Sequence, residues 1–344
     1  MVREVLIVCA AIGAAVVTGC APAQTAQPDL SGWNEAVVIV RDLDAWQDTM
    51  IEVAGWQVRE SGSVDAGLLA HWGLDPAVSG REIVMGQGER DTGWIRFVML
   101  DGVEQDEIRP NDQIWETGGI FNLNLRAADI AATEQALTER NWTAVSDPVE
   151  FTFGPFRVAE WIARGPEGVR FAIIERMEPP LEGFDDLEKL SFAFNSTQIV
   201  PDIEESLAFY RDQLGFQVYL EHRGASDEEG ANVLGLPNEF TDDIERSVYI
   251  LHPQGENLGS IELLQFHGAS GRDFSARAQP WNYGIGALRF PVRNIEDFAN
   301  RLETTGIDLA TPINTLRLAP YGEVRMFAVR APSGAWLEFY EHGD

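Results

Sequence analysis

The hydrophobic pattern changes its period within residues 192–216, FAFNSTQIVPDIEESLAFYRDQLGF. Large apolar residues first alternate with smaller ones, which predicts a strand, and Pro201 ends it because proline cannot donate to a strand ladder. Asp202 can then cap a helix, and Gly215 stands where a helix ends in a left-handed residue. The apolar positions of this helix are three or four residues apart: Ile203, Leu207, Tyr210 and Leu214. The stretch therefore predicts a strand, a helix and the start of another strand.

The same order recurs in three further segments, which begin near residues 36, 120 and 287. The predicted helix caps are Asp42, Asp129, Asp202 and Asn294, and the predicted helix terminators are Gly55, Asn141, Gly215 and Gly306. Cap and terminator are 13, 12, 13 and 12 residues apart in chain order. Asparagine commonly replaces glycine at a left-handed position, so the second copy obeys the same rule. Because several more strands follow each helix, each copy is predicted to be one βαβββ module.

The alternating spacing relates the first copy to the third and the second copy to the fourth, which indicates an internal duplication. We expect an α+β fold of paired βαβββ modules that form two two-module domains. A proline-containing acidic segment is predicted to link the two halves. The predicted boundaries are 33–177 for the first domain (modules at about 33–101 and 117–177), 178–190 for the linker, and 191–344 for the second domain (modules at about 191–267 and 283–342).

The repeated motif resembles that of the vicinal oxygen chelate superfamily, which includes glyoxalase I, bleomycin-resistance proteins and extradiol dioxygenases. The third copy carries the pattern V-x-D-I-x-x-S-L-x-F-Y-x-x-x-L-G-F over residues 200–216, and the resemblance covers nearly all of residues 33–342. It implies that two modules pair so that their curled sheets enclose a cleft for a ligand or a metal ion. Four modules would give two such clefts. The motif itself builds the helix and the core, so it specifies the fold rather than the chemistry.

The resemblance also implies where metal ligands would lie. Enzymes of this superfamily take a His or Gln from the first strand of a module and a Glu from its last strand. The corresponding first-strand positions here are Glu35, Asn122, Asn195 and Ala287, and the last-strand positions are near Phe97, Ala172, Glu262 and Glu338. None of these eight positions holds a histidine, so we do not expect an extradiol dioxygenase. The N-terminal half offers no complete set of ligands.

Glu262 and Glu338 are the candidate catalytic or metal-binding pair of the C-terminal half, with Asn195 as a third oxygen donor. Oxygen-only ligation suits Mg²⁺, Mn²⁺ or Ca²⁺ and suits Zn²⁺ or Fe²⁺ poorly. One glutamate could instead have a raised pKa and abstract a proton next to a carbonyl group. The other alternative is that both are relics of an ancestral site that Arg or Tyr side chains satisfy. The cofactor prediction is therefore either none or one divalent metal ion.

Further ligand-binding candidates lie near the predicted second cleft: Trp281, Tyr283 and His267. Their aromatic character predicts a small aromatic or apolar ligand, and ordinary core packing is the alternative for most of the chain's tryptophans. The leading hypothesis is a small-molecule-binding protein with a degenerate metal site. The alternatives are a metal-dependent isomerase or lyase of glyoxalase type that uses Glu262 and Glu338, and a protein whose surface serves a protein partner.

The chain has 25 Lys and Arg against 55 Asp and Glu, a formal net charge of −30, which disfavours nucleic-acid binding. Its first 20 residues combine a basic start, an apolar run too short to span a bilayer, and small residues before a cysteine. They resemble a bacterial lipoprotein signal with lipidation at Cys20, although a secretory signal or a membrane anchor would share part of this pattern. Residues 21–32 are predicted to be a flexible tether. We expect a lipoprotein anchored on the periplasmic side of the outer membrane.

Overall fold

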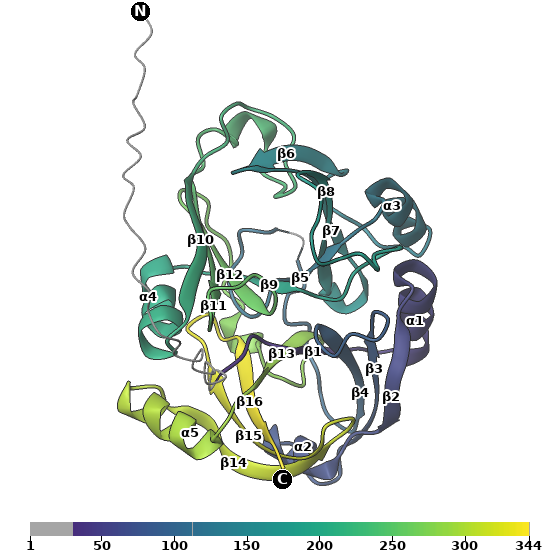
Figure 1. Cartoon of the computed structure of the whole chain (residues 1–344), viewed down its shortest axis with the longest axis vertical. Coiled ribbons are helices and arrows are strands. Elements are labelled where there is room, and N and C mark those ends of the chain that lie inside the picture. The colour runs from purple at the N-terminus through teal and green to yellow at the C-terminus, as the bar shows by residue number, and fades with distance from the viewer. Residues whose placement is uncertain (1–29, 112, 344) are drawn as a thin grey trace, which may run out of the picture.

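The computed structural model describes residues 30–111 and 113–343 (Figure 1). The predicted signal segment, Cys20 and nearly all of the predicted tether lie outside these residues, so they stay predictions. Within the described part, none of the helices is long and apolar enough to cross a membrane.

The described strands form two eight-stranded curled sheets, one below the other in Figure 1. The lower sheet joins the first and fourth modules and is called the 1–4 half-barrel. Its order is β14 (Leu309–Leu318), β15 (Gly322–Arg330), β16 (Trp336–His342), β13 (Gly284–Pro291), β1 (Glu35–Ile39), β4 (Trp94–Asp101), β3 (Ser79–Gly86) and β2 (Gln57–Ser63). The upper sheet joins the second and third modules and is called the 2–3 half-barrel. Its order is β10 (Gln217–Gly224), β11 (Arg246–His252), β12 (Ser260–Phe266), β9 (Asn195–Ile199), β5 (Asn122–Arg126), β8 (Arg170–Glu178), β7 (Phe156–Arg164) and β6 (Val149–Phe153).

One helix follows the first strand of each module, as the sequence predicts, and a further short helix lies in the first module. The helices are α1 (Leu43–Thr49), α2 (Ala66–His71), α3 (Ile130–Thr138), α4 (Ile203–Leu207) and α5 (Ile295–Thr304). Two of them, α1 and α4, continue into π-helical turns over Met50–Ala54 and Ala208–Gln213. Short 3₁₀ turns occupy Pro166–Gly168, Asn238–Phe240 and Ser275–Arg277. Paired βαβββ modules are therefore the observed architecture.

The predicted helix caps and terminators hold with one exception. The side chains of Asp42, Asp129 and Asp202 each accept a hydrogen bond from a backbone N–H in the first helical turn. All four terminators are left-handed, with φ of 73° at Gly55, 62° at Asn141, 83° at Gly215 and 89° at Gly306. The exception is Asn294, which is itself left-handed and makes no side-chain cap. Its side chain instead donates to Asp297 in the same helix.

The prediction that the first module pairs with the second, and the third with the fourth, is wrong. Strand β1 pairs antiparallel with β13, and β5 pairs antiparallel with β9, so each half-barrel takes one module from each half of the sequence. The register places Glu35 directly opposite Arg289. Two buried opposite charges therefore face each other. If the first module paired with the second instead, Glu35 would face Asn124, which has the same position in the second module as Arg289 has in the fourth.

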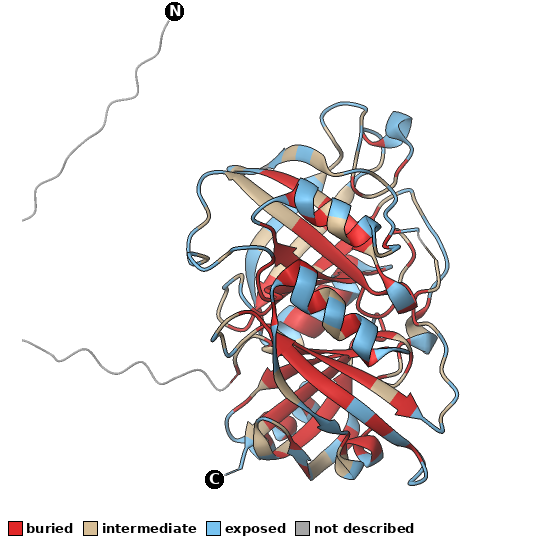
Figure 2. Cartoon of the chain, turned by 90° about the vertical axis from the view of Figure 1, so that its right-hand side faces the viewer, coloured by how far each residue is buried: buried red, intermediate tan, exposed pale blue. Residues whose placement is uncertain are grey.

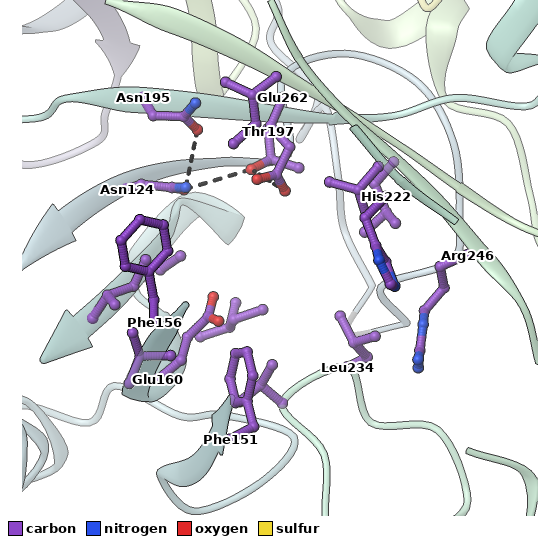
Figure 3. A pocket seen from close by; sticks show the side chains of 18 of the residues that line it. Asn124, Phe151, Phe156, Glu160, Asn195, Thr197, His222, Leu234, Arg246 and Glu262 are labelled. Carbon is purple, nitrogen blue, oxygen red and sulfur yellow. Dashed lines mark hydrogen bonds between the residues drawn. The ribbon is translucent and has the colours of Figure 1, made fainter. Parts of the chain in front are cut away.

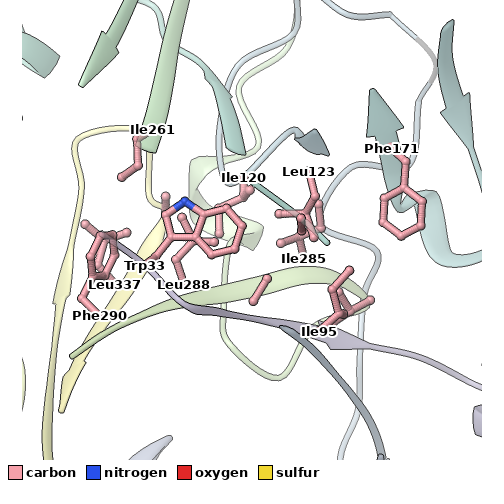
Figure 4. Packing of buried hydrophobic residues seen from close by; sticks show 14 of the residues in the cluster. Trp33, Ile95, Ile120, Leu123, Phe171, Ile261, Ile285, Leu288, Phe290 and Leu337 are labelled. Atoms are coloured by element: carbon pink, nitrogen blue, oxygen red, sulfur yellow. The ribbon is translucent and has the colours of Figure 1, made fainter. Parts of the chain in front are cut away.

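A large apolar core lies between the two half-barrels and holds them together (Figure 4). Trp33 lies within this core, and its indole Nε1–H donates to the backbone oxygen of Ser260 in the other half-barrel at 2.7 Å. The four module helices bury one face against the same core and leave the opposite face in solvent. Figure 2 shows this for α1 and α3, the two helices on the right-hand side of Figure 1. The concave sides of the sheets point away from this core, and they contain the candidate sites.

Candidate functional site

The concave side of the 1–4 half-barrel is filled with side chains. A separate buried apolar cluster occupies it, to which β1, β4, β13, β14, β15 and β16 all contribute. Helix α2 and Trp72, which follows it, complete this cluster from the open side. Trp281 and Tyr283, which the sequence analysis placed at a ligand cleft, pack against this cluster instead, and Arg41 covers the Tyr283 ring at 3.9 Å.

A chain of ion pairs lies within this filled interior. Arg289 donates to both Glu35 and Glu338, with its Nε 2.6 Å from Glu338 Oε2. Arg96 Nε lies 2.8 Å from Glu35 Oε1, and Arg96 Nη1 lies 2.6 Å from Glu82 Oε1. The side chains of Glu35, Arg96, Arg289 and Glu338 are fully buried. Glu338 is thus satisfied by an arginine, which is one of the alternatives that the sequence allows.

The two central carboxylates of this chain stay ionised. Burial raises the pKa of Glu35, but the charges of Arg96 and Arg289 outweigh it, so the net pKa lies below the ordinary value. The pKa of Glu338 is lowered in the same way, against burial, by Arg289 and then by His71. Trp72 Nε1 also donates to Glu338 Oε1 at 2.7 Å. The carboxylate of Glu338 is therefore fully used inside the protein.

This interior does not fit a divalent metal ion. The strand registers show that the position equivalent to Glu262 and Glu338 in the first module is Arg96, whereas the predicted Phe97 belongs to the core between the half-barrels. Two arginines thus stand among the carboxylates, and their guanidinium groups supply the positive charge that an ion would bring. Binding a cation here would require breaking buried ion pairs, which costs several kcal/mol (about 3–5).

The 2–3 half-barrel, by contrast, encloses a cavity of about 770 Å³ on its concave side (Figure 3). Residues of all eight strands of this half-barrel contribute to its lining, and so does the connection after β10. Phe121, Phe151, Phe156 and Leu234 contribute apolar surface. The volume of this cavity suits a drug-sized ligand.

A row of amides crosses the floor of this cavity. Asn122 Nδ2 donates to Asn124 Oδ1, Asn124 Nδ2 donates to Asn195 Oδ1 at 2.9 Å, and Asn195 Nδ2 donates to Ser260 Oγ at 2.6 Å. The oxygen of Asn195, predicted as a metal ligand, therefore already accepts a hydrogen bond. The row fixes the amide orientations and leaves Thr197 and Glu262 beside it, with Thr197 Oγ1 3.4 Å from Glu262 Oε1.

Two carboxyl groups face the cavity, Glu160 from β7 and Glu262 from β12 (Figure 3). Burial raises the pKa of Glu160 to about 8, and the charge of Glu262 adds to this shift. Burial also raises the pKa of Glu262 to about 7, against the hydrogen bond from Thr197. Near neutral pH the pair therefore holds at least one proton, and it can donate or accept one within the physiological range.

The predicted pairing of Glu262 with Glu338 is wrong, because these residues lie in different half-barrels, on β12 and β16. His267 follows β12, where its Nε2 lies 2.8 Å from Ser247 Oγ, and it does not line the cavity. The partner that Glu262 has in the structure is Glu160. A signal for it exists in the sequence, since Glu160 lies between Val158 and Ile162 on one face of an apolar strand.

The donor set of this cavity also fits a metal ion poorly. Of the four positions that the resemblance implies, the 2–3 half-barrel has Asn122, Ala172, Asn195 and Glu262. Only Glu262 is a carboxylate, and the two amides are engaged with each other through Asn124. No group of three or more His, Cys, Asp or Glu side chains arranged to hold a metal ion occurs among the residues the structure describes. The cavity is better suited to an organic ligand than to an ion.

Comparison with known proteins identifies the fold. Residues 193–339 match the model of the Glyoxalase/Bleomycin resistance protein/Dioxygenase superfamily. Glyoxalase I from Zea mays has a similar structure, with a TM-score of 0.60, 14% sequence identity, and coverage of 91% of this chain and 92% of that chain. A putative dioxygenase from Bacillus subtilis is similar with a TM-score of 0.52, 12% identity, and coverage of 92% of this chain and 87% of that chain. No curated protein sequence matches the chain.

These similarities confirm the fold that the sequence predicts, over almost the whole described chain. At such low sequence identity, the structural similarities support the arrangement of paired modules but do not identify a substrate. The chemistry of the chain has to come from its own cavity.

Proposed function

We propose that the protein binds a small organic molecule in the cavity of the 2–3 half-barrel. The observation that supports this is the contrast between two half-barrels of the same fold. One interior is closed by α2, Trp72 and a buried ion-pair chain, whereas the other keeps a cavity of about 770 Å³. An apolar cavity with a few convergent polar groups is the usual form of a ligand site.

The walls indicate the ligand's shape. Phe151 and Phe156 stand on one side, where an aromatic or aliphatic body would bury apolar surface (Figure 3). Asn124, Thr197 and Glu262 stand together on the other side and can donate and accept hydrogen bonds. The proposed ligand therefore has an apolar body and a polar group, and it needs no metal ion to bind.

The neutral fluorescent dye N-phenyl-1-naphthylamine provides a direct test. We expect it to bind the wild-type protein at one site with enhanced fluorescence. Val248, on β11, lines the cavity, so Val248→Trp should fill part of it and weaken dye binding by about tenfold. Titration by fluorescence measures both affinities.

Val218→Trp is the matched control, because Val218 is an exposed residue of the neighbouring strand β10 and does not line the cavity. This variant should bind the dye within about twofold of wild type. The proposal fails if wild-type protein does not bind the dye, or if both tryptophan variants bind it equally.

The carboxyl pair supports a second candidate function, proton transfer at a carbon next to a carbonyl group. Glu160 and Glu262 have pKa values of about 8 and about 7, close to the working pH of a general acid and base. We expect the protein to accelerate deuterium exchange at the benzylic carbon of phenylpyruvate in D₂O. The exchange rate with Glu160→Gln should be about tenfold lower than with the wild-type protein. NMR measures the exchange. Exchange in wild-type protein no faster than in buffer would rule this function out.

A further inference from the structure

Two arginines line one end of the cavity, and neither forms an ion pair with a carboxylate of the described residues. The side chains of Arg126 and Arg176 make no ion pair or hydrogen bond that the structure records, and their Nε atoms are buried and unpaired. Each guanidinium group lies over an aromatic ring instead, Arg126 over Phe194 at 4.3 Å and Arg176 over Phe156 at 4.1 Å. Arg126 is only 7% exposed. A buried guanidinium with free donors is costly unless an anion joins it.

Three other buried arginines have hydrogen-bonding partners for part of their guanidinium groups. In the 1–4 half-barrel, Arg96 and Arg289 each contact two buried carboxylates. Arg109 is also buried, but it donates to the backbone oxygens of Glu116 and Gly118. The aromatic rings beneath Arg126 and Arg176 hold the two groups in place and leave their edges directed away from the ring faces.

The carboxyl groups of Glu160 and Glu262 neutralise these arginines only in part. Glu160 on β7 and Glu262 on β12 have raised pKa values, so they are largely or partly protonated near neutral pH. Burial and the charge of Arg176 lower the pKa of Arg126 to about 10, which still leaves it charged. The remaining groups that line the cavity are Tyr219, His222, Arg246 and Asp227. The buried end of the cavity is therefore positive within a protein whose net charge is −30.

We propose that the ligand is an organic anion, whose carboxylate or sulfonate group binds between Arg126 and Arg176 while its apolar body lies along the aromatic wall, and that it enters together with a proton held by Glu160. This rests on the proposed binding function and specifies its ligand class. Guanidinium groups bind carboxylates through two parallel hydrogen bonds, and both arginines have the free donors to do so.

The uptake of a proton by Glu160 is expected from the positions of the charges around it. An anion placed beside Arg126 and Arg176 cancels the attraction that Arg126 exerts on ionised Glu160. Its own negative charge further disfavours the ionised form of Glu160. Binding above neutral pH should therefore draw a proton onto Glu160 from the solvent, and affinity should fall as the pH rises above about 8.

The experiment compares two dyes that differ by one anionic group. 8-Anilinonaphthalene-1-sulfonate is N-phenyl-1-naphthylamine with a sulfonate added. We expect the sulfonated dye to bind wild-type protein about tenfold more tightly than the neutral dye at pH 7. Arg126→Gln and Arg176→Gln should each remove that advantage and leave neutral-dye binding within about twofold, which also shows that the variants fold. Arg157→Gln, an exposed arginine of β7 with surface ion pairs, is the matched control and should change neither affinity.

Calorimetry at pH 8 in Tris and in HEPES measures the number of protons that the protein takes up when the dye binds. Wild-type protein should take up about half a proton with the sulfonated dye, and Glu160→Gln should take up clearly less, because only Glu262 remains to be protonated. Phenylacetate should displace the sulfonated dye, whereas inorganic phosphate at equal concentration should not.

The outcomes separate the two proposals. Failure of the neutral dye to bind overturns the cavity itself as a ligand site. Binding of the neutral dye with no preference for the sulfonated one, or a preference that survives both arginine replacements, overturns the anion site alone. Displacement by phosphate but not by phenylacetate overturns the assignment to organic anions, and anion binding without proton uptake overturns the role of Glu160.

Discussion

Replacing Arg289 by methionine is expected to lower the free energy of unfolding by about 4 kcal/mol. Arg289 lies between Glu35 and Glu338, and all three side chains are fully buried. Methionine fills a similar volume but leaves Glu338 without its cation and Glu35 with Arg96 alone. The free-energy penalty of a buried carboxylate without a cation is far larger than the net stabilisation that the intact ion pair provides. The protein therefore loses much stability, although the pair itself adds little. Urea unfolding followed by tryptophan fluorescence measures it.

Arg325→Met is the matched control for this experiment. Arg325 lies on β15, in the same half-barrel, and forms ion pairs with Glu296 and Glu341 at the surface. Its loss should cost less than about 1 kcal/mol, because solvent screens exposed pairs and hydrates the carboxylates left behind. If Arg289→Met and Arg325→Met unfolded at the same urea concentration, the buried chain would not be the structural element described here.

Glu160→Gln is expected to raise the free energy of unfolding by about 2 kcal/mol at pH 9 and to change it little at pH 4.5. The pKa of Glu160 rises from 4.5 in the unfolded chain to about 8 in the folded protein, mainly through burial. The folded state therefore holds a proton that the unfolded state has released between these two values. Wild-type stability falls as the pH rises through this window, and glutamine removes that loss. The expected gain is below the full linkage value because the cavity admits water.

Urea unfolding at pH 4.5, 7 and 9 checks this expectation. Glu150→Gln, on the neighbouring strand β6, is the control, since its carboxylate is more than half exposed. That variant should keep the pH dependence of the wild-type protein. Parallel stability curves for wild type and Glu160→Gln from pH 4.5 to 9 would show that the carboxyl group of Glu160 is solvated rather than buried.

The two half-barrels show how one fold has produced two different interiors. At equivalent positions of the paired strands, the 1–4 half-barrel has Glu35 opposite Arg289, and the 2–3 half-barrel has Asn122 opposite Thr197. The first set of side chains forms a self-contained ion-pair chain that needs nothing from outside. The second set is neutral and short, which leaves space for a ligand and leaves the nearby arginines uncompensated. We infer that the 1–4 half-barrel stabilises the molecule and that ligand binding belongs to the 2–3 half-barrel.

Part of the candidate site could be found from the sequence. Asn195 and Glu262 were selected from their places on the first and last strands of the third module, and both line the cavity. Glu160, Arg126 and Arg176 were missed, because they belong to the second module, which was expected to face the first. Trp281 and Tyr283 belong to the fourth module, which the sequence predicts to face the third, and for that reason they are wrongly predicted to line the same cleft as Asn195 and Glu262.

The modules can be predicted from the sequence alone: how many there are, where each helix begins and ends, and which fold they build. These features depend on interactions between residues close in the chain, such as Asp202 with the first turn of its helix and the left-handed Gly215 at its end. The pairing of the modules becomes apparent only in the folded protein, because every module presents the same kind of first strand to a partner. That choice depends on contacts between distant residues, above all Glu35 with Arg289, 254 positions apart. This pairing of modules fills the interior of the 1–4 half-barrel with a buried chain of ion pairs. It also brings Glu160 and Glu262 to the same cavity in the 2–3 half-barrel.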